Sequence, residues 1–171
     1  MKENKLSLQL YGSPLLKKKC REVKGIDFHI RQYLDKMVYM MRRKDGVGLA
    51  ANQAGLDISL IVIETKEKLY KIINPKILKS KGKILFDEGC LSFPGLGLTV
   101  KRSRQVWVNY LDDSGRSIDL QAEGVLAVIL QHEIDHINGV VFIDRVPFFT
   151  RLKIRPQLLK IKKMYKAQHP V

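Results

Sequence analysis

The sequence feature that most constrains this chain is the stretch LAVILQHEIDHINGVVF, at positions 126–142. It places His132 and His136 four residues apart in an otherwise apolar run, with Glu133 directly after the first histidine. Residues four apart share one face of an α-helix, so both imidazoles can reach a single metal ion. Neutral imidazoles suit zinc or ferrous iron, and a nearby carboxylate can take a proton from water at the metal. The stretch therefore predicts a helix that carries half of a metal site.

An exposed polar helix face can produce the same HExxH pattern by chance. Here Val125, Val128 and Ile129 fall on the stripe that His132 and Glu133 continue, so the face is predicted to be buried. An unpaired glutamate would be costly to bury, which favours a metal site. The stripe also predicts an apolar pocket beside the ion, although the same residues are equally consistent with ordinary core packing.

A catalytic ion usually takes three ligands from the protein and leaves one position open. Metzincin proteases supply a third histidine where this chain has Phe142, so that class is excluded. The remaining candidates are Cys20, Cys90, His29 and His169. Cys20 follows three lysines in a segment predicted to be exposed, His29 has no partner nearby in the sequence, and His169 lies in the terminal segment. We favour Cys90, because DEGCLSFPG is a glycine-flanked, proline-bounded loop in which a thiolate can face an ion.

A third segment, DGVGLAANQAG (Asp45 to Gly55), supplies small residues that let a ligand approach the backbone closely. The Gln53 amide can donate a hydrogen bond to a developing oxyanion. Taken alone this signal is weak, because glycine after a helix is usually only a cap. The segment lacks the third glycine of a dinucleotide site and the Lys-Ser/Thr pair of a phosphate loop, so both are excluded.

The apolar spacing predicts an α+β fold of one domain, residues 1–171, without repeats or a change of composition. Strands and helices do not alternate strictly, which disfavours a doubly wound parallel sheet. The predicted helices run from Ile30 to the KDG stop at Lys44, from Gly124 to Ile137, and from Pro156 onward. The predicted strands are Ser59–Glu64, Leu69–Asn74, Leu98–Arg102, Gln105–Leu111 and Arg116–Gln121.

The charge distribution bears on where the protein works. The formal net charge is +14, and residues 151–171 hold seven Lys or Arg and no acid. This basic helical extension suits a polyanion such as ribosomal RNA, although solubility alone also accounts for it. The N-terminal residues have no signal-peptide pattern, and no apolar run is long enough to span a membrane. We therefore expect a cytoplasmic protein with no membrane partner.

Three segments in order, GVGLAANQ (46–53), EGCLS (88–92) and QHEIDH (131–136), resemble the signature motifs of the peptide deformylases. YGSPLL near the N-terminus and VFIDR after the second helix extend the likeness from Tyr11 to Arg145. The resemblance implies antiparallel or mixed strands packed around the helix that bears HExxH, with a C-terminal helix. It also implies a metal held by Cys90, His132 and His136. Ferrous iron is expected in the cell, and zinc, nickel or cobalt can replace it.

The implied reaction removes the N-formyl group from the initiator methionine of nascent polypeptides and releases formate. Glu133 would act as general base and then as proton donor, while the Gln53 amide and the Leu91 backbone N–H stabilise the oxyanion. Backbone at Gly46, Val47 and Gly48 would pair with the formyl-methionyl peptide as an added strand. The methionine pocket would be formed by Val47, Phe86, Val125, Val128 and Ile129.

Two rival interpretations remain at this stage. A general zinc peptidase would use the same HExxH metal-binding pattern but would cleave unformylated peptides. The second rival is an inactive protein, descended from an enzyme, that only binds metal or RNA. Such a protein would have no chemical need for Gln53, Cys90 and Glu133 together with both histidines, so the intact set argues against it. The chain also has Gly97 where many bacterial deformylases carry a longer side chain that helps to hold the peptide.

Overall fold

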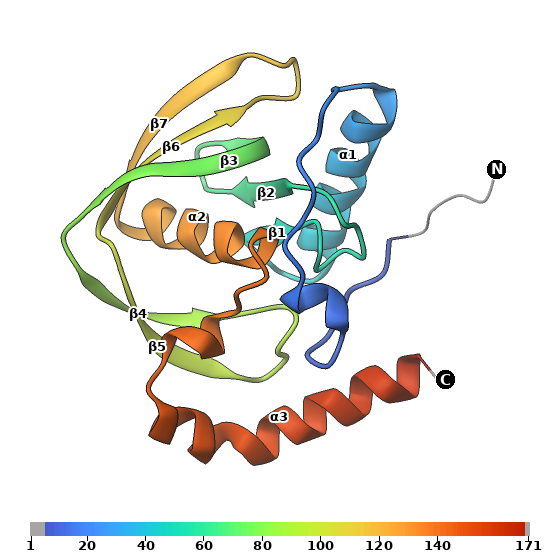
Figure 1. The fold of residues 1–171 in the computed structure, drawn as a ribbon, viewed down its shortest axis with the longest axis vertical. Coiled ribbons are helices and arrows are strands. Elements are labelled where there is room, and N and C mark those ends of the chain that lie inside the picture. The colour runs from blue at the N-terminus through green and yellow to red at the C-terminus, as the bar shows by residue number, and fades with distance from the viewer. Residues whose placement is uncertain (1–5, 170–171) are drawn as a thin grey trace.

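The apolar run around the HExxH motif folds into helix α2 (Gly124–Ile137), which lies at the centre of the computed structural model (Figure 1). The structure describes residues 6–169. The helix spans the predicted residues, and it ends where Gly139 takes a positive φ of 74°. It contacts strands from both the first and the second half of the sequence. The helix therefore brings together segments that are far apart along the chain.

A five-stranded antiparallel sheet covers α2, with the strand order β1-β2-β3-β6-β7. A separate two-stranded hairpin, β4-β5, lies below it in Figure 1. The antiparallel pairing confirms the α+β prediction. The strands are β1 (Gly48–Ala50), β2 (Leu60–Glu64), β3 (Leu69–Lys81), β4 (Ile84–Gly89), β5 (Gly97–Arg102), β6 (Gln105–Leu111) and β7 (Ser117–Glu123).

Strand β2 is buried on both faces because a helix packs against each of them. Leu60 and Val62 join the cluster under helix α1 (Phe28–Arg43), whereas Ile61 and Ile63 join the cluster under α2. Successive strand residues point to opposite faces, so a continuous apolar run suits this position. The two clusters therefore hold α1, the sheet and α2 together as layers.

Helix α1 begins where the Asp27 side chain accepts a hydrogen bond from the Ile30 backbone N–H at 2.9 Å, a typical N-cap. It ends at the KDG stop, where Asp45 takes a positive φ of 54°. This turn directs the chain back into β1. The end of α1 and the start of β1 are thereby fixed beside α2.

The C-terminal helix α3 (Phe148–Gln168) begins before Pro156, so the predicted start was wrong. Pro156 lies inside the helix, where it removes one backbone hydrogen bond. Leu158 and Ile161 are buried against the rest of the chain and stabilise the helix beyond the proline. Short 3₁₀ turns, η1 (Pro14–Lys17) and η2 (Phe142–Arg145), complete the fold. No helix within residues 6–169 is long and apolar enough to cross a bilayer.

Candidate metal centre

The donor atoms of Cys90, His132 and His136 all lie within 4.8 Å of one another. The two histidines are one turn apart on α2, and their ring centroids are 5.0 Å apart. Cys90 follows the last residue of β4, and its Sγ is 3.3 Å from His136 Nε2. The hairpin and the helix thus bring together the three predicted ligands from two separate parts of the chain.

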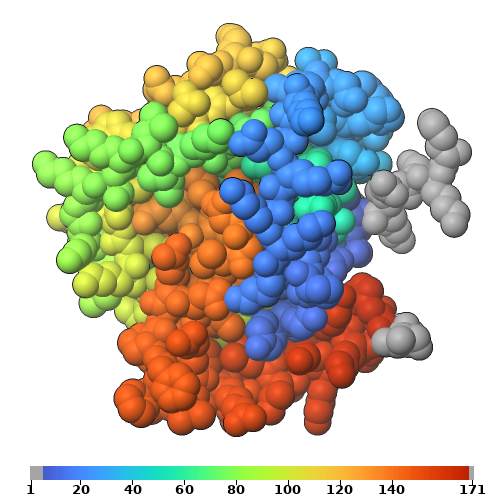
Figure 2. Space-filling view, in the orientation of Figure 1, coloured from blue at the N-terminus to red at the C-terminus, as the bar shows by residue number. Residues whose placement is uncertain are grey.

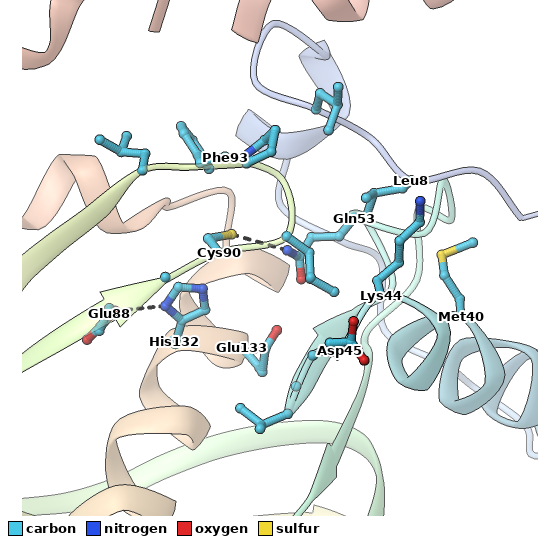
Figure 3. A pocket seen from close by; sticks show the side chains of 18 of the residues that line it. Leu8, Met40, Lys44, Asp45, Gln53, Glu88, Cys90, Phe93, His132 and Glu133 are labelled. Atoms are coloured by element: carbon cyan, nitrogen blue, oxygen red, sulfur yellow. Dashed lines mark hydrogen bonds and ion pairs between the residues drawn. The ribbon is translucent and has the colours of Figure 1, made fainter. Parts of the chain in front are cut away.

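The donor set fits a divalent cation. Glu88 Oε2 lies 2.8 Å from His132 Nδ1, which leaves Nε2 of that ring free for an ion (Figure 3). Burial lowers the pKa of His136 well below its usual value and keeps the ring in the neutral form that binds metals. One thiolate with two neutral imidazoles suits iron or zinc equally.

Glu133 lies beside the donors and is 4% exposed. Its Oε2 atom is fully buried and has no hydrogen-bond partner in the described part of the chain. Burial raises the pKa of this carboxyl to about 7. A buried carboxylate oxygen without a protein partner needs a polar group in the cavity, such as water at a metal ion.

The Gln53 side chain is oriented by a hydrogen bond to the backbone three residues before it. Its Oε1 accepts a hydrogen bond from the Ala50 N–H at 2.9 Å, so only the amide NH₂ faces the site. That Nε2 lies 3.1 Å from Ser92 Oγ. It also lies 3.4 Å from Cys90 Sγ (Figure 3). The fixed orientation allows Gln53 to donate to an oxygen atom at the metal centre.

Gly48 of β1 lies directly against the Glu133 carboxylate. A Cβ added there would lie 2.4 Å from Glu133 Oε1, far closer than such contacts allow. A Cβ added at Gly46 would lie 2.8 Å from Leu91 Cδ1. A side chain at Gly48 would therefore displace the Glu133 side chain, and one at Gly46, just before β1, would displace the Leu91 side chain.

Four charged residues missed at the sequence level form a network behind His132, in which Glu88, Arg102 and Asp135 are buried and Arg145 is exposed. Arg102 Nε donates to Glu88 Oε1 at 2.7 Å, and its Nη1 donates to Asp135 Oδ2 at 2.5 Å. Asp135 also accepts two hydrogen bonds from Arg145 of η2. One sequence signal was available, because the alternation of β5 places Arg102 on the same buried face as Val100.

A cavity of about 1150 Å³ opens beside the donor atoms. It brings together most of the residues predicted for substrate binding, but it does not include Val125. That side chain lies on the first turn of α2 and is 55% exposed. The predicted residues that line the cavity are Gly46, Val47, Gly48, Gln53, Phe86, Leu91, Val128 and Ile129, together with Cys90, His132 and Glu133.

None of the alternative ligands belongs to the donor group, although His169 lines another part of the same cavity. Cys20 was predicted to be exposed, and this was wrong: it is buried against Ala50, Ile61 and Ile134. Burial raises the pKa of its thiol to about 11, which keeps it protonated. His29 lies on the exposed side of α1.

Comparison with known proteins decides the family. Residues 5–151 match the sequence profile of the family described as polypeptide deformylase. The chain belongs to the polypeptide deformylase family. A peptide deformylase of Wolinella succinogenes is 42% identical, with 91% of this chain and 96% of that protein covered. One of Aquifex aeolicus is 39% identical, with 93% and 96% covered.

Solved deformylase structures share the fold. The Thermus thermophilus enzyme superposes with a TM-score of 0.88 at 36% identity, covering 92% of this chain and 98% of that one. A plant peptide deformylase gives a TM-score of 0.92 at 34% identity, covering 100% and 96%. The recognition of the family from three motifs is therefore confirmed. Membership identifies the chain as a metal-dependent hydrolase, and the Cys-His-His group supports a divalent metal ion as its cofactor.

Proposed function

We propose that this deformylase hydrolyses the N-formyl group of formyl-methionine at the start of nascent polypeptides and releases formate. The observation that carries this proposal is the buried Glu133 beside the Cys90, His132 and His136 donor group. We further propose ferrous iron as the metal in the cell, with zinc, nickel or cobalt able to replace it. The mixed thiolate and imidazole donors are compatible with all four.

The reaction can be followed through the residues of this chain. Cys90, His132 and His136 would hold the divalent cation, which would supply Lewis acidity and lower the pKa of water. Glu133 takes a proton as the oxygen of water adds to the formyl carbon. The Gln53 amide and the Leu91 backbone N–H donate hydrogen bonds to the resulting oxyanion. Glu133 then gives its proton to the amine nitrogen as the C–N bond breaks.

Strand β1 supports the proposed mode of peptide binding. It lies at the edge of the sheet and pairs with β2 alone among the described strands. An extended peptide can add to such an edge through backbone hydrogen bonds, here along Gly46–Gly48. The methionine side chain would then enter the apolar part of the cavity between Phe86, Val128 and Ile129.

Substitution of Gly48 by alanine should lower kcat at least about tenfold, because the added methyl group displaces the Glu133 carboxylate from its working position. Metal content should be unchanged, since the three atoms nearest to the added Cβ all belong to Glu133 and none to a donor residue. Formate release and metal analysis on the same preparation check both statements. Gly25→Ala is the matched control, because its added Cβ meets nothing within 4 Å. Equal rates for the two variants would contradict the steric argument.

The activity itself is tested by formate release from formyl-Met-Ala-Ser, beside the unformylated peptide. The protein is purified anaerobically and supplied with ferrous iron. Formate from the first peptide, with the second left intact, is the expected result. Cleavage of the unformylated peptide would indicate a peptidase instead, and no formate from metal-loaded protein would indicate a binding function.

We also infer that residues 1–171 act as one catalytic domain in the cytoplasm, with residues 151–171 as a basic extension that contacts ribosomal RNA. Residues 1–5 and 170–171 lie outside the described part. Support comes from α3, where Leu158 and Ile161 face inward while Lys160, Lys162 and Lys163 are exposed. Exposed lysines bind phosphates and release counterions. Unchanged co-sedimentation with ribosomes after these lysines are replaced by glutamine would contradict the RNA contact.

A further inference from the structure

The cavity at the metal centre extends well beyond the space needed for formyl-methionine. Its volume of about 1150 Å³ exceeds the roughly 300–1000 Å³ of pockets that enclose drug-sized ligands. Its outer end lies away from the donors, and Figure 3 shows Leu8, Met40 and Lys44 across Gln53 from His132. Met164 and Gln168 of α3 and the following His169 also line the cavity. Tyr165, on the same turn of α3, packs against the same apolar cluster as Leu8, which indicates that they lie at this end.

Helix α3 is held at the mouth of the cavity by the N-terminal segment, which lies against it in Figure 2. A Cβ added at Gly12 would lie 3.0 Å from Lys162 Cγ and 3.3 Å from the Tyr165 ring, so the two backbones approach closely. The Tyr165 ring stacks on His169 with centroids 4.5 Å apart. These contacts fix the end of α3 as a wall of the cavity.

The outer end of the cavity offers an apolar surface with a polar rim. Leu6, Leu8, Met40 and Met164 supply the apolar side chains, and Met164 is 41% exposed. Unbranched thioether side chains adapt to ligands of different shape. Lys44 has no ion-pair partner among residues 6–169 and lies at the rim. This surface suits a peptide backbone with an apolar side chain.

The direction in which a bound peptide would run also points to the outer end of the cavity. Gly48 lies against Glu133, and the chain runs back from there through Gly46 to Lys44 at the end of α1. A peptide paired along this edge moves away from the reacting carbon by about 3.3 Å per residue. Residues that follow the methionine therefore pass from the metal centre toward the outer end of the cavity.

We propose that the end of α3, through Met164, binds the third and later residues of the formylated peptide and selects for substrate length and apolar side chains. The inference rests on the proposed deformylase function. It gives α3 a role in substrate binding that is separate from any contact made by its outward-facing lysines. Met164 is a specificity residue under this proposal, and it takes no part in the chemistry.

The test compares Met164→Glu with Leu159→Glu, using formyl-Met-Ala and formyl-Met-Ala-Leu-Leu as substrates. Leu159 is the matched control, because it is 51% exposed on the same helix and does not line the cavity. Both variants change the net charge equally. For Met164→Glu we expect KM for the longer peptide to rise about tenfold with kcat unchanged, and no change for formyl-Met-Ala. Leu159→Glu should match the unsubstituted protein on both substrates.

Three results would overturn the inference. Equal kinetics for the two variants on the longer peptide would show that Met164 does not contact the substrate. A loss of the same size on both peptides would show that the substitution acts on the metal centre or the fold. No formate from any peptide with the unsubstituted, metal-loaded protein would remove the proposed function itself, whereas the first two results leave that function standing.

Discussion

Replacing Glu133 by glutamine should lower kcat by about 100- to 10,000-fold, the range that a positioned general acid–base group contributes. The glutamine side chain has nearly the same shape, so it fits the tight space against Gly48. It cannot take a proton from water or return one to the leaving amine. KM and metal content should remain near those of the unsubstituted protein, because Glu133 is outside the donor group.

The measurement is formate release at saturating formyl-Met-Ala-Ser, with metal content determined on the same sample. Glu123→Gln is a suitable control, since this glutamate directly precedes α2 and its side chain is 60% exposed. A Glu133→Gln protein that retained more than about a tenth of kcat would show that another group moves the proton. Loss of the metal would show that Glu133 supports the ion instead.

Helix α2 could be predicted to the residue because its signals are local. The apolar stripe, the HExxH spacing and the Asn138-Gly139 end all lie within one stretch of sequence. Among the strands, the prediction Gln105–Leu111 matches β6, whereas β3 continues to Lys81 rather than ending at Asn74, and β7 covers Ser117–Glu123 rather than Arg116–Gln121. By contrast, β1 has only three residues, and β4 combines apolar and charged residues. Neither strand shows a hydrophobic period long enough to detect.

The features that sequence analysis missed depend on distant contacts. Cys20 is buried because the C-terminal end of α2 lies over it, and its N–H donates to Ile137 O at 2.8 Å. Pro156 is tolerated within α3 because buried side chains on that helix pack against the N-terminal segment. Neither contact can be predicted from the residues next to Cys20 or Pro156 in the sequence. The predicted metal ligands came from the HExxH spacing and the glycine-flanked loop of Cys90, and the resemblance to a known family then supported them.

The network behind His132 could not be predicted from single segments, because its members come from four elements. Glu88 lies on β4, Arg102 on β5, Asp135 on α2 and Arg145 on η2. In the β4–β5 hairpin Glu88 lies opposite Leu98 and Arg102 lies opposite Ile84, so the long Arg102 side chain reaches along the hairpin to the Glu88 carboxylate. The Glu88 carboxylate in turn orients His132, so the hairpin couples the network to the metal centre.

Arg102→Met should lower the free energy of unfolding of the metal-free protein by about 3–5 kcal/mol, as expected when one partner of a buried ion pair is removed. Arg102 is 5% exposed and lies between the carboxylates of Glu88 and Asp135. Asp135 keeps its second partner, Arg145, but Glu88 is left with His132 alone. Because Glu88 then loses its fixed orientation, metal affinity should also fall by about 10- to 100-fold.

Urea denaturation of metal-free protein measures the first effect, and competition with a chelator measures the second. Arg42→Met is the matched control, since Arg42 makes a similar two-fold hydrogen-bonded pair with Glu64 on the surface. Solvent screens that exposed pair, so its loss should leave both stability and metal affinity unchanged within error. If Arg102→Met were as stable as Arg42→Met but bound metal weakly, the network would serve only to orient His132. If both properties matched the control, Glu88 would hold His132 in place without help from Arg102.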